Sequence, residues 1–122
     1  MFLWLQTEPE RLGRQVAVVE DERNRLFLSA ASSWEIAIKY ALGRLPLPEP
    51  PSAYVPKRMR AIGAEALNIE HGHALAVATL APRHGDPFDR LLVAQALSLE
   101  MTILTVDELM ADYSVRTLLI DR

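Results

Sequence analysis

The sequence contains no cysteine, which excludes a disulfide framework and a thiolate metal site. It has no apolar run of membrane length, and the opening segment Met1–Leu5 is too short for a signal core. Basic residues are not in excess, since 13 Lys and Arg stand against 16 Asp and Glu. This balance argues against a protein that coats nucleic acid non-specifically, because such binding depends on neutralising phosphates. We expect a cytoplasmic protein with no membrane contact.

The chain does have enough apolar residues for one core. Its 122 residues are 50% hydrophobic, which suits a single domain. Apolar segments predict strands at 26–29, 66–69, 102–105 and 117–120. Helical spacing predicts helices at 2–22, 33–42, 52–62, 70–80, 86–99 and 107–111, and five prolines between 44 and 56 predict an extended connector. Apolar strands that alternate with helices favour a parallel sheet covered on both faces.

Three acidic residues stand where a predicted strand or loop turns into a helix. Glu35 follows the strand at 26–29, Asp107 follows the strand at 102–105, and Asp89 lies in the first turn of the helix after Asp86. In open parallel sheets, sites form beyond the carboxyl ends of the strands. Carboxylates that meet at one point repel each other unless a cation lies between them, and oxygen ligands suit Mg²⁺ or Mn²⁺. The three acids therefore form a candidate metal site.

Each acid also has a purely structural interpretation. The run Ser32-Ser33-Trp34-Glu35 has the form of a capping box, in which Glu35 accepts from the backbone N–H of Ser32. Asp86-Pro87-Phe88-Asp89 has the same form with Asp86 as the N-cap, and Asp107 also suits a capping position. Spacing alone leaves capping and metal binding open for these acids. For Asp86, we expect capping rather than a role beside a metal.

Longer segments carry a resemblance to a known family. They are Ser29-Ala30-Ala31-Ser32-Ser33-Trp34-Glu35-Ile36-Ala37-Ile38-Lys39, Gly43-Arg44-Leu45-Pro46-Leu47-Pro48, Asp86-Pro87-Phe88-Asp89-Arg90-Leu91-Leu92-Val93-Ala94-Gln95-Ala96 and Thr105-Val106-Asp107. In this order the segments closely resemble the PIN-domain ribonuclease toxins of the VapC type. The resemblance implies an α/β fold, a PIN-like three-layer α/β/α sandwich with a mostly parallel sheet, as a single domain over residues 1–122.

The same resemblance implies a function. It points to an endoribonuclease that depends on Mg²⁺ or Mn²⁺ and acts as the toxin of a type II toxin–antitoxin system. Glu35, Asp89 and Asp107 would then be the catalytic, metal-binding acids. RNA would be the substrate, a co-encoded antitoxin the partner and a homodimer the assembly.

Basic residues near these acids are candidate RNA contacts. Arg90 follows Asp89 and Lys39 lies one turn after Glu35, although each is also spaced to pair with an acid of its own helix. Arg83 and His84 precede Asp86 in the loop before the helix. Three further basic residues either form a solvated helix face or line a groove for the RNA backbone, namely Lys57, Arg58 and Arg60. Trp4 and Trp34 are expected in the core.

The N-terminus departs from the family pattern. Family members begin with an apolar strand that ends in an aspartate, followed by Thr-His and then an apolar helical stretch, which Phe2–Leu5 matches here. The comparison predicts that the first, central strand and its aspartate are missing, and Glu8 and Glu10 lie too far along to replace that acid. A start codon upstream of Met1 is the favoured explanation, because the other elements are intact. A degraded toxin gene and a strand donated by another chain are the alternatives.

Two other functions compete with the active toxin. The first is a catalytically inactive PIN remnant that still binds an antitoxin or associates with itself. The second is a receiver-like phosphoacceptor domain, which also gathers acids at strand ends. The second is discounted, because neither 26–29 nor 66–69 ends in the required acids.

Overall fold

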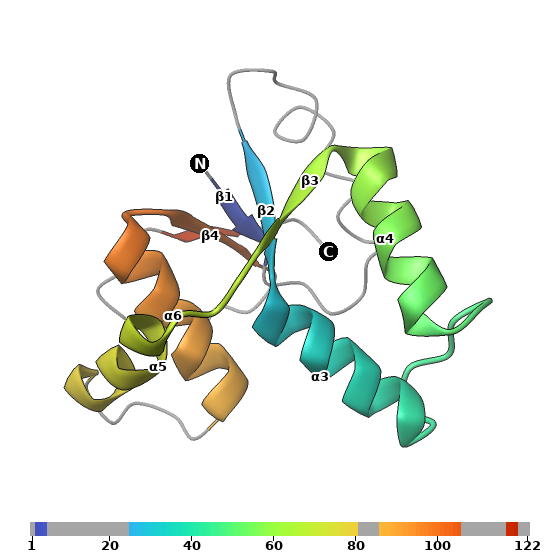
Figure 1. Ribbon diagram of the computed structural model, residues 1–122, viewed down its shortest axis with the longest axis horizontal. Helices are drawn as coiled ribbons and strands as arrows, with labels where there is room; N and C mark the ends of the chain where they lie inside the picture. The colour runs from blue at the N-terminus through green and yellow to red at the C-terminus, as the bar shows by residue number, and fades with distance from the viewer. Residues whose placement is uncertain (1, 5–24, 81–85, 106–116, 120–122) are drawn as a thin grey trace.

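The computed structural model describes residues 2–4, 25–80, 86–105 and 117–119 (Figure 1). In chain order, its elements are β1 (Phe2–Trp4), β2 (Leu26–Ser29), α3 (Ala30–Ala41), α4 (Pro51–Ile62), β3 (Ala64–Leu67), α5 (His71–Ala76), the 3₁₀ helix η1 (Val77–Thr79), α6 (Pro87–Leu99), β4 (Thr102–Thr105) and β5 (Thr117–Leu119). Among these residues no helix combines the length and the apolar character that a bilayer span requires.

The described strands form one sheet in the order β3-β2-β1-β4-β5, and every pairing is parallel. The α/β fold with a parallel sheet that the sequence predicts is therefore confirmed. The strands at 26–29 and 102–105 have the predicted bounds, whereas β3 begins two residues earlier than predicted. The predicted helix at 107–111 lies outside the described residues.

β1 overturns two predictions for the N-terminus. Phe2–Trp4 is not helical, and the central place in the sheet is not vacant, because β1 fills it. Leu3 stands in register with Phe27 of β2 on one side and with Ile103 of β4 on the other. A strand here satisfies the backbone donors and acceptors along both neighbouring edges, and a short apolar run has no periodicity that separates helix from buried strand. Residues 5–22 of the predicted helix lie outside the described part.

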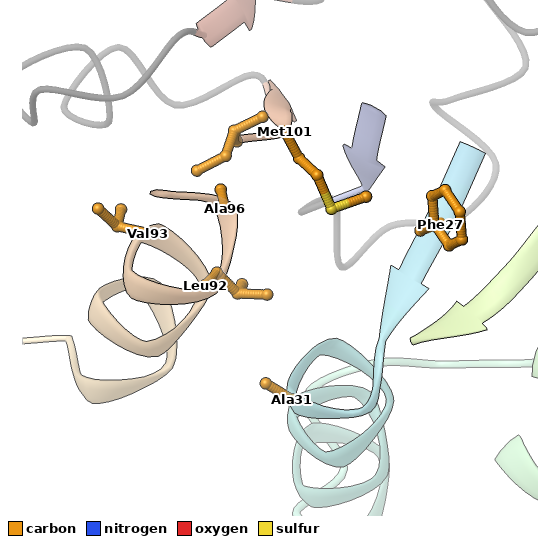
Figure 2. Packing of buried hydrophobic residues seen from close by; sticks show 7 residues of the cluster. Phe27, Ala31, Leu92, Val93, Ala96 and Met101 are labelled. Carbon is orange, nitrogen blue, oxygen red and sulfur yellow. The ribbon is translucent and has the colours of Figure 1, made fainter. Parts of the chain in front are cut away.

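β2 separates two hydrophobic clusters, because successive side chains of a strand point to opposite faces. Leu26 and Leu28 pack with Ile36 of α3 and Val55 of α4. Phe27 points the other way and packs with Ala31 at the start of α3 (Figure 2). The other members of its cluster come from α6, from the residue before β4 and from β4, namely Leu92, Val93, Ala96, Met101 and Ile103. Helices therefore cover both faces of β2, with α3 and α4 to one side and α5 and α6 to the other (Figure 1).

The proline-rich connector is shorter than predicted. Pro51 is the first residue of α4 and Pro56 lies inside this helix, so the connector ends at residue 50. A proline at the first helical position loses no helical hydrogen bond, because the N–H group there has no intrahelical partner. Gly63 ends α4 in the left-handed conformation with φ 71°, which glycine adopts without a Cβ clash.

A buried polar contact fixes α6 against the segment between β3 and α5. Gln95 is fully buried, and its Nε2 donates to the backbone oxygen of Asn68 at 3.0 Å. His73, also buried, accepts from the backbone N–H of Glu70 at 3.1 Å through Nδ1. Nδ1 of His73 also lies 3.4 Å from Nε2 of Gln95, so His73 helps to hold α5 beside α6.

The core behind α3 gives a stability test. Ile36 is completely buried against β2, so Ile36→Ala should lower the free energy of unfolding by about 2–5 kcal/mol, and Ile36→Val by about 0.5–1.5 kcal/mol. Leu75→Ala is the control, because Leu75 is 72% exposed and should change stability by less than about 0.5 kcal/mol. Urea denaturation of the three variants measures these differences. Equal losses at positions 36 and 75 would contradict the described packing.

Candidate metal centre

Two helices begin close together at the carboxyl edge of the sheet. α3 follows directly on the carboxyl end of β2, and α6 leads back into β4, which runs parallel to β2 in the same sheet. A helix that connects to a parallel strand in this way starts at the edge where the preceding strand ended. The first turns of α3 and α6 are therefore the part of the fold where acidic side chains can meet.

Glu35 does not cap its helix. α3 begins at Ala30, three residues before the predicted start, and its N-cap is Ser29, whose Oγ accepts from the backbone N–H of Ala31 at 3.1 Å. Glu35 consequently lies in the second turn, and the capping-box interpretation is wrong for it. The residue is only 8% exposed. A buried carboxylate without a capping role needs another partner for its charge.

Asp86 and Asp89 stand at the start of α6. Asp86 is the N-cap, as predicted, and its Oδ1 accepts from the backbone N–H of Phe88 at 2.9 Å and of Asp89 at 3.5 Å. Both of these bonds use the same oxygen, so capping leaves Oδ2 of Asp86 unused. Asp89 is the acidic residue of the first turn and is half-buried.

Three carboxylates converge at this point. One oxygen each from Glu35, Asp86 and Asp89 lie within 4.8 Å of one another. The structure thus brings together two of the three predicted site acids, while Asp107 lies outside the described residues. Asp86 is the member that the sequence assigned to capping alone. The sequence contained a signal for this third acid, because Asp86 stands only three residues before Asp89 at the start of the same helix.

The electrostatics of the cluster centre on Glu35. Burial raises the pKa of Glu35 above its ordinary value, and the nearby negative charge of Asp86 raises it further. The ammonium of Lys39 opposes both effects from 3.6 Å away. The net pKa stays raised chiefly because Glu35 is buried: the attraction of Lys39 outweighs the repulsion of Asp86 but not the effect of burial. A further cation at the cluster, or a proton on Glu35, would lower the cost of burying this charge.

Two of the candidate RNA contacts already have partners within the protein. Lys39 pairs with Glu35 one turn earlier on α3 and keeps 43% of its side chain exposed. Arg90 donates through Nη2 to the backbone oxygen of Leu80 at 3.4 Å, which links α6 to the end of η1. Arg83 and His84 lie outside the described residues.

An aromatic pair joins the same two helices. The rings of Trp34 and Phe88 meet edge to face, with centroids 5.0 Å apart and planes at 68°. The prediction that Trp34 belongs to the core is wrong, because it is 59% exposed. The buried residues of α3 are Ala31, Ser32, Glu35 and Ile36, so a different face of the helix packs on the sheet from the one that the spacing predicted. The prediction for the side chain of Trp4 stays untested.

Known proteins share sequence and fold with this chain. The sequence model of the PIN domain matches residues 1–115. Ribonuclease VapC16 from Mycobacterium tuberculosis is 58% identical over 57 residues, which is 47% of this chain and 40% of that protein. The matched segment therefore spans less than half of the relative's length.

Solved structures match over nearly the whole chain. VapBC2 from Rickettsia felis, bound to a DNA fragment from its promoter, has a TM-score of 0.72 at 12% identity and covers 99% of this chain and 100% of that one. FitAB bound to the IR36 DNA fragment has a TM-score of 0.62 at 19% identity, covering 97% and 94%. FitAcB from Neisseria gonorrhoeae has a TM-score of 0.60 at 21% identity, covering 97% and 96%. At these identities the likeness shows the fold alone. The match of the family model to residues 1–115 of 122 shows that the chain belongs to the PIN domain family.

Proposed function

We propose that this protein is a Mg²⁺- or Mn²⁺-dependent endoribonuclease, the VapC-type toxin of a type II toxin–antitoxin system. The observation that carries the proposal is the convergence of Glu35, Asp86 and Asp89 within 4.8 Å. The 57-residue match to a ribonuclease supports RNA as the substrate. The likeness to toxin–antitoxin complexes supports a co-encoded antitoxin as the partner, and a homodimer remains part of the proposal.

The residues of the cluster suit a hard divalent cation. All three offer carboxylate oxygens, the donors that Mg²⁺ and Mn²⁺ prefer, and their oxygens lie within 4.8 Å of one another, where a cation would offset both their mutual repulsion and the burial that raises the pKa of Glu35. Glu35, Asp86 and Asp89 would hold the ion, and we propose Asp107 as a further ligand. Such an ion supplies an acidified water and polarises the phosphoryl oxygens of the substrate.

The protein's own groups would position the ion and the RNA. The Ser29 cap and the buried Ile36 hold α3 in place, so the Glu35 carboxylate has little freedom to turn away. Lys39 lies at the rim of the cluster, where an exposed ammonium can meet an RNA phosphate while it stays near Glu35. Arg90, Arg83 and His84 are proposed as further phosphate contacts.

A second function is favoured by one feature of the sheet. β1 is the central strand, and its residues are Phe2, Leu3 and Trp4, followed in the sequence by Leu5, Gln6 and Thr7. The aspartate that the resemblance places at the end of this strand is therefore absent. An inactive PIN remnant that binds an antitoxin or a second copy of itself is consistent with a cluster that has lost one ligand.

A cleavage assay separates the two functions. With single-stranded RNA and Mn²⁺ we expect cleavage that EDTA abolishes, and we expect Asp89→Asn and Glu35→Gln to lower the rate by about 10- to 100-fold or more, because each removes a ligand charge. Glu65→Gln is the control, since Glu65 is an exposed acid of β3 paired with Arg25 at 3.0 Å. Cleavage that survives EDTA would contradict the metal mechanism. A wild-type chain that never cleaves RNA would support the second function, an inactive PIN remnant.

Asp86 allows its two roles to be separated. Asparagine caps a helix about as well as aspartate but carries no charge, so Asp86→Asn should change the free energy of unfolding by less than about 0.5 kcal/mol. If Asp86 helps to hold the ion, the same variant should bind Mn²⁺ about tenfold more weakly or worse. Calorimetric titration with Mn²⁺ and thermal denaturation measure the two effects. Unchanged Mn²⁺ affinity would leave Asp86 as a cap only.

Stability should depend on pH through Glu35. Because its folded-state pKa is raised, the metal-free folded protein holds this proton more tightly than the unfolded chain, and the stability that results is lost as the pH rises through the folded pKa. Glu35→Gln should therefore raise the Tm by a few degrees at neutral pH in EDTA. The gain should vanish below about pH 4, under the ordinary pKa of an unfolded glutamate. Thermal denaturation across this pH range tests it, and a lower Tm for the variant at neutral pH would contradict it.

A further inference from the structure

We propose that Trp34 and Phe88 form a stacking platform for an unpaired RNA base beside the carboxylate cluster. The proposal rests on the ribonuclease function above and adds the side chains that would hold a base of the RNA. Two observations carry it: the position of the aromatic pair and the exposure of Trp34.

The aromatic pair borders the acids on both helices. Trp34 directly precedes Glu35 on α3, and Phe88 stands between Asp86 and Asp89 on α6. The two helix starts therefore meet twice, once through carboxylate oxygens within 4.8 Å and once through rings whose centroids are 5.0 Å apart. On this proposal, a nucleotide whose phosphate lies at the acids would place its base against these rings.

Trp34 offers exposed aromatic surface. It is 59% exposed, while Ile36, two residues further along the same helix, is completely buried. An edge-to-face contact covers at most one face of one ring, so the contact with Phe88 leaves an aromatic face uncovered. The same contact holds the indole in place, which lowers the conformational entropy that a ligand must remove when it stacks.

The charges around the pair favour a base as the occupant. The cluster is acidic and the whole chain has a formal net charge of −3, so attraction to phosphates is weak over most of the molecule. Stacking does not depend on charge and is available with every base, and it contributes about 5- to 150-fold in affinity for each base. Side chains can stack only on bases that are free of a duplex, which selects single-stranded segments.

The test measures RNA affinity separately from cleavage. Fluorescence anisotropy of a labelled oligouridylate, in EDTA to prevent turnover, is compared for the wild type, Trp34→Ala, Trp34→Tyr and Leu42→Ala. Leu42 is the matched control, because it is 61% exposed and lies at the other end of α3. We expect Trp34→Ala to bind about tenfold more weakly, Trp34→Tyr to retain most of the affinity and Leu42→Ala to bind like the wild type.

Two controls show that the effect comes from the base. The affinity for an abasic oligonucleotide should be the same with and without Trp34, and the Mn²⁺ affinity of Trp34→Ala should match that of the wild type. The Tm of this variant should fall by only a few degrees, because the variant loses the aromatic contact with Phe88. RNA affinity that is unchanged in Trp34→Ala, or a wild type that binds no oligouridylate, overturns the proposal. If Trp34→Ala weakens the complex with the antitoxin but not with RNA, the pair contacts protein and the proposal is overturned.

These outcomes separate the stacking platform from the ribonuclease function. Mn²⁺-dependent cleavage with unchanged RNA affinity in Trp34→Ala would refute stacking alone. RNA binding that depends on Trp34 in a chain that never cleaves would support stacking and refute the ribonuclease function.

Discussion

The repulsion among Glu35, Asp86 and Asp89 is the constraint on which the candidate site depends. Their oxygens lie within 4.8 Å of one another, and Glu35 is almost completely buried. Burial raises the pKa of Glu35 and the charge of Asp86 adds to the rise, while Lys39 opposes both without cancelling them. Such an arrangement costs stability unless a cation is present, so the rest of the fold must hold the acids in place against it.

Several independent contacts hold the two helix starts in place. Ser29 caps α3 at the last residue of β2, so no flexible loop separates the strand from the helix that carries Glu35. Asp86 caps α6 with one oxygen, and its other oxygen is free to face the cluster. Behind the site, Ile36 packs on one side of β2 and Leu92 on the other. The same groups therefore serve both the fold and the geometry of the acids.

Membership of the PIN domain family gives this arrangement its biological context, and β1 marks the difference from the family's sequence pattern. The strand occupies the central place of the sheet and satisfies the backbone of both neighbours, yet it has no acid. Backbone pairing requires only a strand in this position, whereas metal binding requires a particular side chain at its end. A chain can therefore keep the fold while one ligand is missing, which is why fold and activity need separate tests here.

Much of the fold could be predicted from local patterns in the sequence. β2, β4 and α6 have nearly the expected bounds, because apolar runs and the Asp86-Pro87 start are signals that need no distant partner. Glu35 and Asp89 were identified in the same way, by their positions after strand and helix boundaries. Tertiary structure decided the features that depend on distant residues. Phe2–Trp4 is a strand because it pairs with β2 on one side and with β4 on the other. Asp86 belongs to the cluster because α6 begins beside α3. Trp34 is exposed because the face of α3 that packs on the sheet carries Ala31, Ser32, Glu35 and Ile36. The helical spacing by itself allowed more than one apolar face, and only the packing against β2 and the neighbouring helices decided between them.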